Sequence, residues 1–135
     1  MRKILIAEDE VALRSLMAHL MTSRGFHVTR TGNGLEAWEE ACKTNFDLVI
    51  TDAGMPLLSG EELIEKLQVA QPNVPVLLVS ADRSRIRSAI EKGLNCAFLA
   101  KPFRPADLVK QVERMIGREE EIPLAPSRSQ GTPVL

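Results

Sequence analysis

Short apolar segments alternate with stretches of helical periodicity along this chain, five times over. The apolar segments are the predicted strands, at residues 3–7, 26–30, 48–51, 76–79 and 97–100. Between and after them, apolar residues recur three and four positions apart, as they do on one face of a helix. Alternating strands and helices form a parallel sheet with helices on both faces and right-handed crossovers. The sequence therefore predicts a doubly wound α/β fold, a three-layer (βα)5 sandwich.

The predicted helices each carry an apolar stripe that we expect to face the sheet. The stripe of the first is Leu13, Leu16, Met17 and Leu20; that of the second is Leu35, Trp38, Ala41 and Cys42; that of the fourth is Ile86, Ala89 and Ile90. Ser59 is a candidate N-cap for the third helix, and the last two helices are expected to end near Gly93 and Gly117. The segment 26–30 alternates apolar and polar residues, which is typical of an edge strand with one solvated face.

Length and composition place the chain among ordinary globular proteins. Its 135 residues are enough for one domain with a single core, and 44% apolar with 26% charged residues is a common balance for a soluble chain. A net charge of -1 gives no electrostatic reason to expect nucleic acid or an anionic membrane as the main partner. The apolar run near the start is too short for a signal peptide or a membrane span, so we expect a cytoplasmic protein.

The two cysteines and the end of the chain complete the domain organisation. Cys42 and Cys96 lack the spacing of a metal or redox motif and stand in apolar-patterned segments, so we expect buried thiols and no disulfide. Residues 1–118 are the predicted domain, and residues 119–135 have the composition of a flexible linker or tail. The chain is then either a stand-alone domain or part of a longer protein.

Charged and polar residues follow four of the five predicted strands. Glu8 and Asp9 follow the first, Asp52 the third, Ser80 the fourth and Lys101 the fifth. Ligands of doubly wound sheets bind beyond the carboxyl ends of the strands, where these residues lie. Two like charges about 4 Å apart cost roughly 4 kcal/mol at an effective dielectric near 20, so the acids need a counter-charge. Mg²⁺ prefers carboxylate and phosphate oxygens, and lysine binds phosphate as a point charge. The sequence predicts a site for Mg²⁺ and a phosphoryl group.

Five short motifs carry a resemblance to a known family. They are Glu8-Asp9, Asp52, Met55-Pro56, Ser80-Ala81 and Lys101-Pro102-Phe103, in this order at the strand ends. With them the chain resembles the receiver domains of two-component response regulators, of the chemotaxis-regulator type, over about residues 2–118. The resemblance implies a flavodoxin-like fold with the sheet order 2-1-3-4-5. It also implies a phosphorelay signalling protein rather than an enzyme, one that takes part in its own phosphorylation and dephosphorylation.

The resemblance assigns roles at the acidic strand ends. Asp52 would be the phosphoacceptor. Glu8 and Asp9 would bind Mg²⁺ together with Asp52 and the backbone carbonyl of Gly54, and Lys101 would contact the phosphoryl oxygens. The donor would be a sensor histidine kinase or a histidine phosphotransfer protein.

A second set of implied roles concerns the response to phosphorylation. Ser80 would hydrogen-bond the phosphoryl group after transfer, and Phe98 would change rotamer with it. The face formed by the fourth helix, the fifth strand and the fifth helix would then change and regulate a partner or an output domain, without direct nucleic-acid or membrane binding by this domain. The Lys101–Pro102 bond is expected to be cis. Gly54 and Asp82 depart from the usual family pattern, and both bear on the lifetime of the phosphorylated form.

Two other functional classes share parts of this pattern. A Mg²⁺-dependent phosphohydrolase with an aspartyl nucleophile uses similar chemistry, but it usually carries a DxD arrangement after the first strand, where this chain has Glu8-Asp9-Glu10. A flavin-binding module of the same topology needs a loop rich in Ser, Thr and Gly at that place. Arg83, Arg85 and Arg87 lie two apart and so spread around the fourth helix, which predicts a solvated face rather than a phosphate-binding patch.

Overall fold

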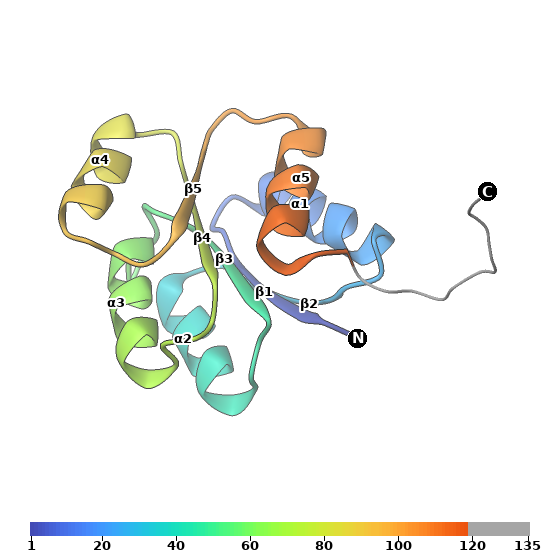
Figure 1. Ribbon diagram of the computed structural model, residues 1–135, viewed down its shortest axis with the longest axis horizontal. Helices are drawn as coiled ribbons and strands as arrows, with labels where there is room; N and C mark the ends of the chain where they lie inside the picture. Colours follow the sequence, from blue (N-terminus) through green and yellow to red (C-terminus); the bar gives the residue numbers. More distant parts are fainter. Residues whose placement is uncertain (119–135) are drawn as a thin grey trace.

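The computed structural model describes residues 1–118 and shows strands and helices in alternation (Figure 1). The strands are β1 (Lys3–Ala7), β2 (His27–Thr31), β3 (Leu48–Asp52), β4 (Val76–Ser80) and β5 (Ala97–Ala100). The helices are α1 (Val11–Ser23), α2 (Gly34–Lys43), α3 (Gly60–Ala70), α4 (Arg83–Glu91) and α5 (Pro105–Ile116). No helix in the described part of the chain is long and apolar enough to cross a membrane. The predicted tail, residues 119–135, lies outside the described residues.

The five strands form one parallel sheet in the order β2-β1-β3-β4-β5. Both the predicted order and the prediction of an edge position for the second strand are confirmed. Ala7 pairs with Thr51, Asp52 with Val79 and Ser80 with Ala100. This register places the carboxyl ends of β1, β3, β4 and β5 at one edge of the sheet, so the residues that follow them meet there.

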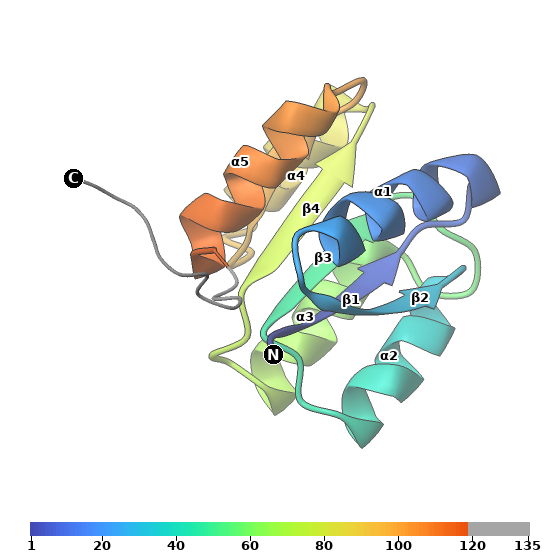
Figure 2. The same ribbon diagram turned by 90° about the vertical axis from the view of Figure 1, so that its right-hand side faces the viewer.

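Two hydrophobic cores lie on opposite faces of the sheet. Helices α2, α3 and α4 cover one face, and α1 and α5 cover the other, which faces the viewer in Figure 2. Strand residues alternate between the cores: Leu5 and Val49 belong to the first, and Ile4 and Ile50 to the second. Because both faces are covered, the central strands β3 and β4 are buried along their whole length.

Several residues of the predicted apolar stripes do not face the core. Leu16, Leu35 and Ile90 are 42%, 43% and 58% exposed, and Cys42 is also exposed. Each of these residues is next in sequence to a buried residue. Leu16, for example, precedes Met17, which is fully buried. Successive helical residues point about 100° apart, so such neighbours cannot both face the sheet. The expectation of a buried Cys42 is therefore wrong, whereas Cys96 is partly buried, and burial raises the pKa of its thiol to about 11.

The start of α3 is held close to the end of β3. Ser59 is the predicted N-cap, and it forms a capping box with Glu62. Gly60 follows it, and its backbone N–H donates to the Ala53 carbonyl over 2.8 Å. A Cβ at residue 60 would collide with the Asp52 carbonyl, so glycine permits this close approach. The first turn of α3 consequently lies beside the strand end that carries Asp52.

Candidate functional site

Three carboxylates converge at the carboxyl ends of β1 and β3. One oxygen from each of Glu8, Asp9 and Asp52 lies within 4.8 Å of the others. Glu8 and Asp52 are buried, at 1% and 8% exposure, whereas Asp9 is exposed. The structure thus brings together three acids that stand at the ends of two different strands, β1 and β3. An arrangement of oxygen donors with one open side suits a hard divalent cation such as Mg²⁺.

Lys101 supplies the positive charge of the cluster. Its Nζ lies 3.1 Å from Glu8 Oε1 and 3.0 Å from Asp52 Oδ1. Burial acts to lower the pKa of the Lys101 ammonium, but its hydrogen bonds and ion pairs with Asp52 and Glu8 raise that pKa above its usual value. The Lys101–Pro102 peptide bond is cis, as expected from the resemblance.

Glu8 is the most buried acid of the cluster. Burial raises the pKa of its carboxyl; the hydrogen bond from the Glu10 backbone N–H opposes this, and the negative charge of Asp52 raises the pKa further. Lys101 lowers it, but the outcome is a pKa above the usual value for glutamate. Three carboxylates share one ammonium here, so the excess of negative charge provides a physical reason for this donor set to accept a cation.

Ser80 and Asp82 connect β4 to α4 beside the cluster. The buried Ser80 Oγ accepts a hydrogen bond from the Asp82 backbone N–H over 3.0 Å. The Asp82 carboxylate caps α4 by accepting hydrogen bonds from the Ser84 backbone N–H and hydroxyl. Those bonds from Ser84 lower the pKa of Asp82. The carboxylate of Asp82, one of the two departures from the family pattern, is thus hydrogen-bonded to the first turn of α4.

Phe98 lies in the edge strand β5, which is separated from β3 by β4. It is paired in register with Leu78, and its partly buried ring packs against the core under α2, α3 and α4. This position is an ordinary packing position at the edge of the sheet. It is also three residues before Lys101, so its backbone is continuous with the strand end that delivers the ammonium.

Arg85 differs from the prediction of a solvated face for the three arginines of α4. Its Nε and Nη2 each lie 2.8 Å from a carboxylate oxygen of Glu61, and Nη2 also donates to the Ala53 carbonyl over 3.1 Å. Arg85 therefore joins α4 to α3 and to the loop after Asp52, rather than belonging to a solvated face. The clue in the sequence is Gly54, because a residue without a side chain leaves room there for the guanidinium.

Sequence comparison relates the chain to signalling proteins. The family model for the response regulator receiver domain matches residues 4–113. A probable transcriptional regulator ycf29 from Pyropia yezoensis is 33% identical over 123 residues, which are 87% of this chain and 54% of that protein. Chemotaxis protein CheY-3 from Vibrio cholerae is 31% identical over 121 residues, 86% of this chain and 92% of that protein. The chain thus spans about half of the first relative and nearly all of the second.

A solved structure shows the same fold. The receiver domain of a sensor histidine kinase from Pseudomonas aeruginosa PAO1 superposes with a TM-score of 0.77 at 26% identity, covering 86% of this chain and 98% of that one. That structure is described with a magnesium ion coordinated in its active-site cleft.

Proposed function

This chain belongs to the response regulator receiver domain family, and from that premise we propose that it is a phosphorylation-activated signalling receiver whose phosphoacceptor is Asp52. The observation that carries the proposal is the position of Asp52, at the end of the buried strand β3 and 3.0 Å from the Lys101 ammonium. A turn or capping role would not require this lysine and two further acids around the carboxylate. Residues 1–118 would form the whole receiver.

The proposed reaction is transfer of a phosphoryl group from a phosphohistidine to Asp52. A carboxylate oxygen of Asp52 attacks phosphorus in line with the leaving nitrogen, so that a P–O bond forms as the P–N bond breaks. The imidazole nitrogen keeps the electron pair of the broken bond, and the ring leaves as the donor's histidine. The product on this chain is an acyl phosphate. A sensor histidine kinase or a histidine phosphotransfer protein would supply the phosphohistidine.

The surrounding residues would hold the charge of the transferred group. Lys101 is already placed between Glu8 and Asp52, so its ammonium needs little movement to contact phosphoryl oxygens. Glu8, Asp9, Asp52 and the backbone carbonyl of Gly54 would hold Mg²⁺, which when bound neutralises negative charge on the phosphoryl oxygens. Burial of Glu8 and Asp52 excludes water from one side of the site and strengthens these interactions.

Phosphorylation would then change the equilibrium between two conformations. The Ser80 hydroxyl, which donates to the Asp82 carbonyl over 3.4 Å, would donate to a phosphoryl oxygen instead. Phe98 would then fill the space that the Ser80 side chain leaves. The face made by α4, β5 and α5 would change and regulate a partner protein or an output domain. The change can be only as large as the difference in affinity of the two conformations for the phosphoryl group.

A small phosphodonor tests the acceptor directly. Incubation with acetyl phosphate and Mg²⁺ is expected to add one acid-stable, base-labile phosphoryl group, measured by intact mass. Asp52→Asn removes the nucleophilic oxygen and is expected to abolish the label. Asp47→Asn is the matched control, because Asp47 is exposed and its carboxylate binds the Lys3 backbone N–H at the amino end of β1.

Two results would contradict the proposal. Full labelling of Asp52→Asn would place the nucleophile elsewhere in the chain. Sustained turnover of a phosphate ester by the wild type, lost in Asp52→Asn, would instead favour the Mg²⁺-dependent phosphohydrolase with an aspartyl nucleophile.

A further inference from the structure

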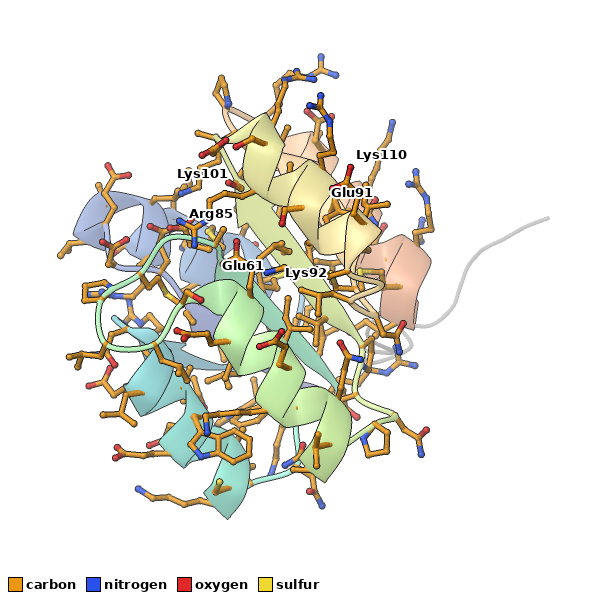
Figure 3. The ribbon with its side chains drawn as sticks, turned by 90° about the vertical axis from the view of Figure 1, so that its left-hand side faces the viewer. Glu61, Arg85, Glu91, Lys92, Lys101 and Lys110 are labelled. Carbon is orange, nitrogen blue, oxygen red and sulfur yellow. The ribbon has the colours of Figure 1, made fainter. Side chains whose placement is uncertain are left out.

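The guanidinium of Arg85 lies between a carboxylate of α3 and the loop that follows Asp52. Figure 3 shows Arg85 on α4 and Glu61 on α3 pointing toward one another, with Lys101 near the same end of the sheet. Nε and Nη2 form a two-point contact with Glu61, and Nη2 reaches the carbonyl of Ala53, the residue directly after Asp52. Arg85 thus connects two helices to the strand end of the proposed acceptor.

Gly54 makes room for this position. A Cβ at residue 54 would lie 2.7 Å from Arg85 Nη1, too close for any real contact. Nη1 is the third guanidinium nitrogen; the hydrogen bonds to Glu61 and Ala53 are made by Nε and Nη2. It lies over the backbone of Gly54, two residues after Asp52. Glycine at position 54, where the chain departs from the usual family pattern, therefore leaves room for a cationic group of α4 beside the site.

The charges around Arg85 already include the proposed acceptor. Its pKa is raised chiefly by the hydrogen bonds to Glu61, against the opposing effect of burial, and the negative charges of Glu61, Asp52 and Asp82 raise it further. A phosphoryl group adds negative charge and three acceptor oxygens at Asp52. Guanidinium groups bind such oxygens in a planar two-point geometry. Phosphorylation would then offer Arg85 a second acceptor, stronger than Glu61, on the residue that precedes Ala53.

We propose that Arg85 is a phosphoryl-binding residue: when Asp52 is phosphorylated, its guanidinium exchanges the Glu61 carboxylate for phosphoryl oxygens. The inference rests on the proposed role of Asp52. The exchange would break the contact between α4 and α3 while anchoring α4 to the acyl phosphate, so the same residue would report phosphorylation to the α4 side of the molecule. Glu61 then competes with the phosphoryl group for the guanidinium of Arg85.

The competition predicts opposite effects for the two partners. Beryllofluoride, BeF₃⁻, is a phosphoryl analogue that binds carboxylates at equilibrium, and its affinity with Mg²⁺ present can be measured by calorimetric titration of the whole chain. Arg85→Gln is expected to weaken binding by about tenfold, the loss of one charge-assisted hydrogen bond. Glu61→Gln is expected to tighten it several-fold, because the displaced carboxylate no longer holds the arginine. Arg85→Lys should lie between Arg85→Gln and the wild type, since lysine keeps the charge but loses the planar fork.

Arg87→Gln is the matched control. Arg87 lies on the same helix and is exposed, so this variant removes the same charge without the contact to Glu61, and its affinity should equal that of the wild type. If Arg85→Gln does not fold, the comparison of Glu61→Gln with Glu65→Gln decides, because both remove a negative charge from α3 but only Glu61 holds the arginine.

Failure of this inference differs from failure of the proposed function. If the wild type takes a phosphoryl group on Asp52 but Arg85→Gln binds BeF₃⁻ as tightly as the wild type, only the role of Arg85 is overturned. The same conclusion follows if Glu61→Gln weakens binding as much as Arg85→Gln, since the pair would then merely support the fold. If the wild type takes no label at Asp52, the proposed function fails, and the role of Arg85 fails with it.

Discussion

The Lys101 ammonium contacts two acids at once, 3.1 Å from Glu8 and 3.0 Å from Asp52. One cation between two carboxylates cannot neutralise both, and Asp9 adds a third acid at the exposed side. Burial is the main cause of the raised pKa of Glu8, and the negative charge of Asp52 contributes to it. At the scale of single residues, the site is therefore built to gain stability from a bound cation.

A thermal melt with and without Mg²⁺ tests this consequence. Under the proposed function, Mg²⁺ would bind the folded chain, and it is expected to stabilise the fold by about 2.7 kcal/mol at a concentration one hundred times Kd. Asp9→Ala removes one oxygen ligand and is expected to abolish most of this increment, while slightly raising Tm without metal by relieving repulsion. NaCl at equal ionic strength controls for screening, and Glu10→Gln controls for loss of a neighbouring charge. An equal increment in Asp9→Ala and the wild type would exclude Asp9 as a ligand.

At the scale of elements, an ion pair between Glu61 and Arg85 joins α3 to α4. Burial is the largest single effect on the pKa of Glu61 and acts to raise it. The hydrogen bond and the charge of Arg85, together with hydrogen bonds from the Glu61 backbone and from Ser59, outweigh burial and leave the pKa below the ordinary value of 4.5. A carboxyl group whose pKa is lowered by folding stabilises the fold above its unfolded-state pKa. That stabilisation is lost as the pH falls through the lower pKa of the folded state.

A double-mutant cycle on Glu61→Gln and Arg85→Gln measures this contact. The Arg85 side chain is 37% exposed, so solvent screens the pair, and we expect a coupling in the free energy of unfolding of about 1 kcal/mol at pH 7. The coupling should decrease below pH 4.5 and disappear beneath the folded-state pKa of Glu61. Urea unfolding at several pH values provides the measurement. A cycle with Arg87→Gln in place of Arg85→Gln should show no coupling, and a pH-independent coupling would contradict the ionic origin of the contact.

At the scale of the whole molecule, burial is unevenly distributed across the sheet. Every residue of β3 and β4 is buried, whereas all four residues of the edge strand β5 are partly buried. In α4 the buried residue is Ala89, compared with four buried residues in α3. Regions with little buried surface open at lower free energy than the rest of a structure. The side formed by α4 and β5 is therefore better able to move than the central strands when the site changes.

Amide hydrogen exchange can locate that movement. Saturation with BeF₃⁻ and Mg²⁺ is expected to change exchange in α4, β5 and the start of α5, and to leave α1 and α2 nearly unchanged because they lie away from β5. Asp52→Asn under the same conditions should show no difference. A uniform decrease over all elements would indicate general stabilisation by ligand rather than a change confined to this face.

The order and type of the elements could be predicted from the sequence because their signals are local. Apolar alternation, helical spacing, the Ser59 cap and the glycines at 93 and 117 act within a few residues, and the structure follows them closely. The strand order came from the resemblance, not from any local pattern. The acids and the lysine could be singled out because parallel strands must bring their carboxyl ends to one edge.

Tertiary structure alone decided which of several similar residues would matter. Arg83, Arg85 and Arg87 are equivalent in the sequence, yet the packing of α4 turns Arg85 toward Glu61, 24 residues earlier in the chain, and over Gly54. In the same way, the packing of α1, α2 and α4 on the sheet leaves four residues of the predicted stripes outside the core: Leu16, Leu35, Cys42 and Ile90. The physical reason is that periodicity defines a stripe on a helix, but the rotation of that helix on the sheet depends on contacts between residues far apart in the chain.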